Sequence, residues 1–159
     1  MTRVYGDMNL YVELQKEKFQ ISSEQYEEIM RGQKMFVGGG AAEVNQLRRQ
    51  FLGMTKNQQE RFLVELPRSA LIEQLDDGLC LYRSKHALCG GNMAACRPAD
   101  CNNALVSIDG KRKSFQWRKH ENTRLLNFFR HDQPKVVYLI ARNDQLDKLL
   151  LQIDQAEMV

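Results

Sequence analysis

All four cysteines of this 159-residue chain lie within one stretch of 22 residues, and no other feature restricts the fold as strongly. The stretch also contains Gly90, Gly91 and Pro98, residue types that favour tight turns and interrupt regular helices. It therefore predicts an irregular segment that is held together through its sulfur atoms. The spacing of the cysteines is Cys80-x8-Cys89-x6-Cys96-x4-Cys101.

We interpret the four thiols as ligands of one structural zinc ion. Four thiolates suit a tetrahedral Zn²⁺ ion, and a closed site of this kind leaves no open position for catalysis. The spacing lacks the paired C-x2-C motif of zinc ribbons and fingers. His86 is an alternative ligand that would leave Cys80 as a buried thiol. Four free thiols or two disulfides are the alternatives to metal binding.

The composition, with 43% hydrophobic and 27% charged residues, is typical of a globular protein with its own core. The first residues form no apolar signal sequence, and no apolar run approaches the roughly 18 residues of a membrane span. The expected location is therefore cytoplasmic, where cysteines are more commonly thiols or metal ligands than disulfides. Neither a membrane partner nor a small-molecule substrate is expected.

Helical periodicity dominates on both sides of the cysteines, so the predicted fold is mainly α, with short helices around an irregular zinc knuckle. Capping boxes at Ser22 with Gln25 and at Thr55 with Gln58 predict two helix starts, and Gly32 predicts a helix end. No strand is expected. The helices expected before the knuckle cover approximately residues 10–19, 22–31, 41–52 and 56–66, with a last helical turn at 70–75.

Two helices are expected after the knuckle, near residues 114–130 and 134–154. Asp132 and Pro134 suit the start of the second helix. We divide the chain into a helical region (1–77) and a region with the knuckle and the basic C-terminal helices (78–159), with one continuous domain as the alternative. The expected apolar stripe of the last helix consists of Leu139, Leu146, Leu149 and Ile153.

Basic residues are concentrated in the middle of the chain. Residues 80–130 hold ten Lys and Arg but three Asp and Glu, whereas both flanks are slightly acidic. Such a distribution favours a polyanionic partner, of which nucleic acid is the commonest, and an ordinary solvated surface is the alternative. Trp117 and the phenylalanines of this stretch are expected in the core. The predicted nucleic-acid contacts, which would meet phosphates, are Lys111, Arg112, Lys113, Arg118, Lys119 and Arg124.

Three short runs of the cysteine-rich stretch resemble a segment found in some large tyrosine recombinases (phage-integrase family) of mobile elements. In those proteins the segment follows the catalytic tyrosine and precedes C-terminal helices, which is the order predicted here. The resemblance is best over residues 78–103 and implies a role in DNA integration or recombination. One extra residue separates Pro98 from Cys101. The runs are Gly78-Leu79-Cys80, Ala87-Leu88-Cys89 and Cys96-x-Pro98-x-x-Cys101-x-Asn103.

The first five residues resemble the Thr-x-x-Tyr run in which this family places its nucleophile, which implies Tyr5 as the group that attacks the scissile phosphate. The family also needs two arginines, a lysine and a His-x-x-Arg box. None of the histidines here, His86, His120 and His131, has an arginine three residues later. We therefore expect a C-terminal portion of such an enzyme, or a separate protein sharing that portion, that does not cleave DNA by itself.

The leading functional hypothesis is a zinc-stabilised, DNA-associated C-terminal module of an integrase or recombinase. The second hypothesis is a module for protein–protein interaction or self-association without nucleic-acid binding. A separate hydrolase or nuclease would need paired carboxylates or a metal held by histidines. Asp76 and Asp77 are the only acidic pair near the cysteines, and we interpret them as solvated.

Overall fold

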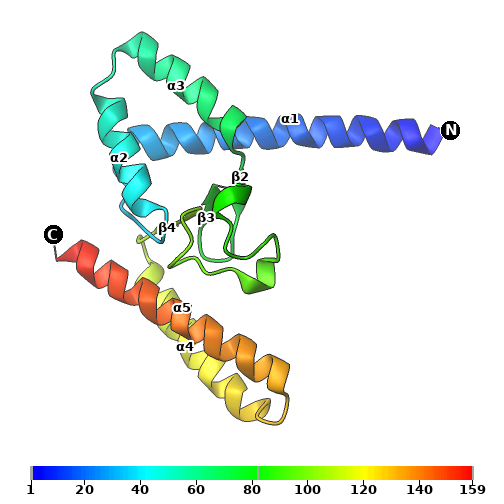
Figure 1. Cartoon of the computed structure of the whole chain (residues 1–159), viewed down its shortest axis with the longest axis vertical. Helices are drawn as coiled ribbons and strands as arrows, with labels where there is room; N and C mark the ends of the chain where they lie inside the picture. Colours follow the sequence, from blue (N-terminus) through cyan, green and yellow to red (C-terminus); the bar gives the residue numbers. More distant parts are fainter. Residues whose placement is uncertain (1, 82, 159) are drawn as a thin grey trace.

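A computed structural model describes the backbone of residues 2–81 and 83–158, and the side chains of residues 8–81, 83, 85–92 and 94–158. Within these residues the chain forms five α-helices and a small four-stranded antiparallel sheet. Three helices lie on one side of the sheet and two on the other (Figure 1). The predicted mainly helical fold is confirmed, whereas the sheet was not predicted.

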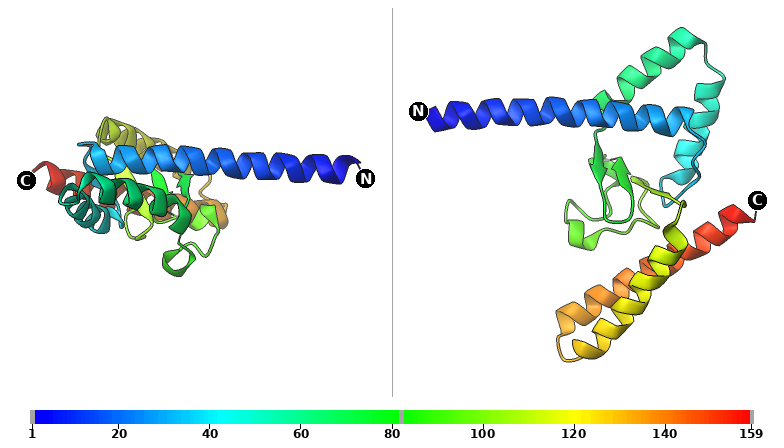
Figure 2. Two further views of the ribbon diagram at one scale, coloured as in Figure 1. Left: turned by 90° about the horizontal axis from the view of Figure 1, so that it is seen from above. Right: turned by 180° about the vertical axis from the view of Figure 1, so that it is seen from behind.

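The first helix, α1 (Thr2–Arg31), is a single element of 30 residues rather than two short helices. The expected capping box at Ser22 does not form, because the buried Ser22 hydroxyl instead accepts a hydrogen bond of 3.0 Å from the backbone N–H of Ile72. The helix ends before Gly32, as predicted. In both views of Figure 2 its N-terminal half extends beyond the rest of the molecule.

The next two helices, α2 (Ala41–Leu52) and α3 (Lys56–Ser69), follow the predicted pattern closely. Gly53 ends α2, and the capping box of Thr55 and Gln58 begins α3. Pro67 lies in the last turn of α3 without ending it. The following residues form a strand, so the helical turn expected at 70–75 is wrong.

The sheet has the strand order β1-β4-β3-β2, and every pair of neighbours is antiparallel. It combines strands from both sides of residue 78, and the loops that carry Cys89, Cys96 and Cys101 connect two of its neighbouring strands. These loops contain the single-turn helices η1 (Ser84–His86) and η2 (Met93–Ala95). The strands are β1 (Phe36–Val37), β2 (Ile72–Gln74), β3 (Leu79–Leu81) and β4 (Ala104–Ser107).

Strand β4 lies between two hydrophobic clusters. Leu105 belongs to the cluster beneath α1, α2 and α3, and the next residue, Val106, belongs to the cluster beneath the C-terminal helices. Both side chains are fully buried. Successive strand residues point to opposite faces, so this short strand holds the two helical layers together.

The N-terminal cluster contains a buried tyrosine whose hydroxyl has one clear partner. Tyr26 on α1 donates a hydrogen bond of 2.6 Å to the carbonyl oxygen of Ala70, and burial raises the pKa of its phenol to about 12. A Tyr26→Phe variant should lower the free energy of unfolding by about 1–3 kcal/mol, because the buried Ala70 carbonyl loses its donor. Urea denaturation measures this loss.

The exposed Tyr11 on the same helix provides the matched control, and Tyr11→Phe should change the free energy of unfolding by less than about 0.5 kcal/mol. The phenol of Tyr26 also adds a pH dependence. The unfolded chain loses this proton near pH 10 and the folded chain near pH 12, so stability should fall across that range. Equal stability of both variants, with the same alkaline pH dependence, would contradict this role of Tyr26.

The C-terminal helices, α4 (Lys111–Phe128) and α5 (Gln133–Glu157), form an antiparallel hairpin at the predicted positions (Figure 1). The side chain of Asp132 accepts a hydrogen bond from the N–H of Lys135 and caps α5. Phe115 is buried, but Trp117 and Phe128 are 64% and 78% exposed, so their expected place in the core is wrong. The predicted stripe on α5 is buried throughout, at Leu139, Leu146, Leu149 and Ile153. No helix in the described residues is long and apolar enough to span a membrane.

Candidate metal centre and nucleic-acid interface

The four cysteines come from four different places around the loops between β3 and β4. Cys80 lies on β3, Cys89 follows η1, Cys96 follows η2, and Cys101 lies just before β4. All four line one cavity of about 50 Å³, which Leu75 and Ala104 also border. Cys101 is buried and the other three are half-buried. The antiparallel pairing of β3 with β4 closes this arrangement, because it holds Cys80 opposite Ala104.

The four thiols line one cavity, but their sulfur atoms are not arranged around a common point as the ligands of a metal ion would be. All four cysteines are free, and the thiol of Cys101 donates a 3.4 Å hydrogen bond to the carbonyl oxygen of His86. No group of three or more His, Cys, Asp or Glu among the described side chains is placed to hold a metal ion as it stands. The donor set fits zinc in type and number. Binding would require the four sulfur atoms to move towards a common point.

Burial acts on the protonation of these thiols. It raises the pKa of Cys80 to about 11, and the neighbouring Cys101, Cys96 and Cys89 shift this pKa in the same direction. Burial also raises the pKa of Cys96, while the guanidinium of Arg142 acts in the opposite direction. Both thiols therefore carry protons at neutral pH in this structure, and a bound cation would have to displace them.

The alternative ligand, His86, lies in η1 with an exposed side chain. The described residues that line the cavity include all four cysteines but not His86, whose backbone carbonyl is the group that meets Cys101. This placement favours four thiolates over a ligand set that includes the imidazole.

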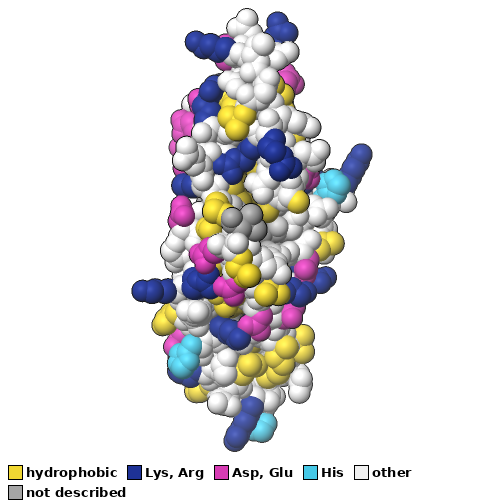
Figure 3. Space-filling model, turned by 90° about the vertical axis from the view of Figure 1, so that its left-hand side faces the viewer, with side chains coloured by type: hydrophobic (Ala, Val, Ile, Leu, Met, Phe, Trp, Pro, Cys, Tyr) yellow, Lys and Arg dark blue, Asp and Glu magenta, His cyan; other side chains and the backbone are white. Residues whose placement is uncertain are grey.

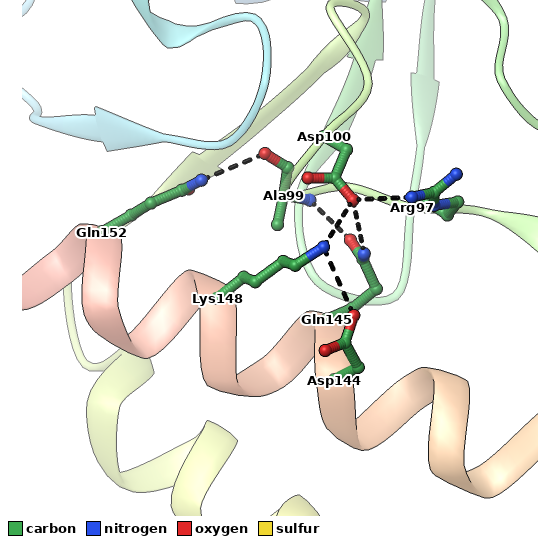
Figure 4. Close-up of polar contacts among 7 residues, drawn as sticks. All are labelled: Arg97, Ala99, Asp100, Asp144, Gln145, Lys148 and Gln152. Atoms are coloured by element: carbon green, nitrogen blue, oxygen red, sulfur yellow. Dashed lines mark hydrogen bonds and ion pairs between the residues drawn. The ribbon is translucent and has the colours of Figure 1, made fainter.

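A polar network attaches the cysteine-bearing loops to α5 (Figure 4). The Oδ2 atom of Asp100 accepts hydrogen bonds from Gln145 at 2.9 Å and from Lys148 at 3.2 Å, and it pairs with Arg97 at 3.2 Å. The bond from Gln145, together with the cations, lowers the pKa of Asp100 below its usual value. Gln145 also accepts a 2.9 Å hydrogen bond from the backbone N–H of Ala99.

Gln152, seven residues after Gln145 on α5, adds two further hydrogen bonds. Its side chain donates to the carbonyl oxygen of Ala99 at 3.0 Å and accepts from the N–H of Gly38 at 2.9 Å. Sequence reasoning missed these residues because isolated polar side chains between apolar positions resemble an ordinary solvated helix face.

A buried carboxylate forms a second polar centre beside the cysteines. Asp77, in the turn between β2 and β3, is only 4% exposed and forms ion pairs with Arg118 on α4 and Arg142 on α5. Arg142 also donates to the carbonyl oxygen of Cys96 at 3.4 Å. The interpretation of Asp77 as a solvated residue is therefore wrong, whereas Asp76 is exposed. The carboxylate connects the sheet to both C-terminal helices.

Most of the predicted nucleic-acid contacts are engaged within the protein. Arg112 pairs with Asp154 and Glu157 of α5, and Lys119 pairs with Asp147 at 2.5 Å. Of the other four predicted contacts, two also form ion pairs within the part of the chain that the structure describes and two do not. Arg118 meets the buried Asp77, Arg124 pairs at 2.9 Å with Glu121 on its own helix, and Lys111 and Lys113 form no ion pair with any described residue.

The acidic side chains of α5 thus neutralise part of the basic stretch that precedes it. On the face of the molecule drawn in Figure 3, basic and acidic side chains are interspersed and do not form one continuous basic patch. Charge counted along the sequence therefore overstates the positive surface that a polyanion could meet.

Tyr5 falls on the N-terminal turns of α1, and its side chain lies outside the described residues. Comparison with known proteins finds no matching family model, curated protein or solved structure. The resemblance to tyrosine recombinases thus rests on the sequence runs alone.

Proposed function

We propose that this chain is a zinc-stabilised, DNA-associated C-terminal module of an integrase or recombinase of a mobile element. The single observation that carries the proposal is the cavity lined by Cys80, Cys89, Cys96 and Cys101, which brings every cysteine of the chain together. A zinc ion held there by four thiolates would be structural, because no coordination position would be left for a substrate. Its role would be to hold loops that contain little regular structure.

The nucleic-acid part of the proposal rests on the start of α4. Lys113 is exposed at the first turn of this helix, shortly after β4, the strand that follows the cysteine-bearing loops. A lysine that has no partner within the described residues is free to meet a phosphate, whereas Arg112 beside it is already engaged by two carboxylates.

Binding to DNA is tested by its salt dependence. A labelled duplex should bind at low salt, and the logarithm of the affinity should fall linearly as the logarithm of the salt concentration rises. A Lys113→Gln variant should reduce that slope by about 1, because one phosphate contact is lost. Fluorescence anisotropy titrations at several salt concentrations measure the slope.

Lys56→Gln is the matched control, because Lys56 is exposed at the first turn of α3, in the other helical layer. It should leave the slope unchanged. If no DNA binds at low salt, or if both variants change the slope equally, the DNA-associated function is wrong.

Self-association is a second candidate function, favoured by the N-terminal half of α1. This part of the helix extends beyond the rest of the molecule (Figure 2). It carries several exposed apolar residues. An apparent mass that rises with protein concentration in the absence of nucleic acid would favour this function. The exposed apolar residues of this half are Met8, Leu10, Tyr11, Val12 and Leu14.

A further inference from the structure

One face of α4 carries a row of exposed residues that overlaps only in part with the basic residues predicted to contact nucleic acid. Lys113, Trp117, His120 and Arg124 follow one another at intervals of four, three and four residues and are all exposed. This spacing places them on one side of a helix. We name them the α4 stripe.

The other side of α4 is occupied by the rest of the protein. Phe115 is buried in the C-terminal cluster, and Asn122 donates a 3.0 Å hydrogen bond to Asn143 of α5. Arg118 and Lys119 are held by carboxylates of other elements. The α4 stripe, in contrast, is exposed along its length and is available to a partner.

The chemistry of the stripe matches a polyanion that has aromatic rings. None of its four side chains is acidic. Arg124 pairs with Glu121 of its own helix through Nε and Nη2 only, and its side chain is 65% exposed, so the remaining N–H groups of its guanidinium are available to a phosphate. Trp117 is 64% exposed, although the indole is a large apolar group that normally packs in a core or an interface. A surface of exposed indole between cations suits nucleic acid, whose bases stack on aromatic rings while its phosphates meet Lys and Arg.

Stacking on an exposed indole favours a single strand over a duplex as the ligand. In a duplex the faces of the bases are covered by their neighbours, whereas in a single strand they are free to stack on an aromatic side chain. Lys113 and Arg124 lie on opposite sides of Trp117, about 6 Å and about 10 Å from it along the helix axis, so their long side chains can reach phosphates on both sides of a stacked base.

We propose that the α4 stripe binds single-stranded nucleic acid, with an unpaired base stacked on Trp117 and its flanking phosphates contacted by Lys113 and Arg124. This inference rests on the proposed function, because it specifies the form of nucleic acid and the residues that the module uses. It also replaces Arg112, Arg118 and Lys119 as contacts, since these three side chains serve the fold.

The chain offers a direct test because Trp117 is its only tryptophan. Oligothymidylate of about 20 nucleotides should quench the tryptophan fluorescence of the full chain on binding, and the quenching should be reversed by salt. Inorganic polyphosphate, which has the charge but no bases, should compete for binding without the same quenching. A duplex of equal length should quench less than the single strand.

A pair of exposed aromatic residues provides the variants. Trp117→Ala should weaken the binding of labelled oligothymidylate by about 5- to 150-fold, the range for the loss of one stacked base. Tyr11→Ala removes a ring that is equally exposed, at 64%, but lies on α1, and it should leave the affinity unchanged. Circular dichroism of both variants checks that each retains the helical content of the parent chain.

The outcomes separate the two proposals. If neither single strand nor duplex binds at low salt, the proposed function itself fails. If DNA binds but the Trp117 fluorescence does not respond, or Trp117→Ala binds as well as the parent chain, the function stands and the α4 stripe is not its binding surface. Equal quenching by polyphosphate would likewise overturn the stacking of a base.

Discussion

Removal of zinc is expected to release the loops between β3 and β4 from the rest of the protein. In the described part of these loops the only regular elements are two single-turn helices. Metal ligation in small zinc modules supplies an apparent free energy of about 10–16 kcal/mol. Elemental analysis of the purified, reduced chain should therefore return about one zinc per molecule. A strong chelator should then make the loops sensitive to trypsin at Arg83 and Lys85.

Substitutions distinguish the two ligand sets. Replacing any one of the four cysteines by serine should lower the zinc content, whereas His86→Ala should retain it, because His86 lies outside the residues that line the cavity. Loss of zinc from His86→Ala but not from Cys80→Ser would establish the alternative set of three thiolates and an imidazole. A metal-free purified chain whose digestion does not respond to the chelator would show that the zinc proposal is wrong.

Replacing Asp77 by asparagine is expected to cause the largest loss of stability among single substitutions outside the apolar core. The side chain of Asp77 is 6% exposed and is the carboxylate between Arg118 and Arg142. Asparagine has nearly the same shape but no charge, so it leaves two guanidinium groups without their counter-charge. Removal of one partner from a buried ion pair costs about 3–5 kcal/mol. Urea denaturation at neutral pH measures the change.

The adjacent Asp76 provides the control. It is exposed, so Asp76→Asn should change the free energy of unfolding by no more than about 0.5 kcal/mol. If the two variants have the same stability, the Asp77 ion pairs do not stabilise the folded chain. Arg142 also contacts the backbone at Cys96, so the Asp77→Asn variant should make the cysteine-bearing loops more sensitive to trypsin as well.

Elements whose ends depend on nearby residues could be predicted from sequence. The end of α2 at Gly53 and the capping box of α3 at Thr55 and Gln58 involve groups only a few residues apart. The apolar stripe of α5 was also predicted, because a period of 3.6 residues is visible over 25 residues of helix. The local signals failed at Ser22, where a distant strand uses the hydroxyl that a cap would need.

The strands were missed for a related reason. They contain two to four residues each, and an alternation of polar and apolar residues needs a longer run to be recognised. Part of their stability comes from partners far away in the sequence, such as Phe36 opposite Ser107 and Leu79 opposite Leu105. Propensity alone therefore did not distinguish β2 from the end of a helix.

The clustering of the cysteines in 22 residues, the helical character of the flanks and the basic stretch are properties of the sequence alone. Which side chains meet is a property of the folded chain. Pairing of β3 with β4 places four cysteines around one cavity. Packing of α4 against α5 and the sheet pairs Arg112 and Lys119 with carboxylates of α5 and Arg118 with Asp77, while Trp117 is left exposed. The physical reason is distance: helix periodicity and capping depend on residues within four positions, whereas ion pairing joins groups that are separated by up to 65 residues along the chain, as Arg142 and Asp77 are.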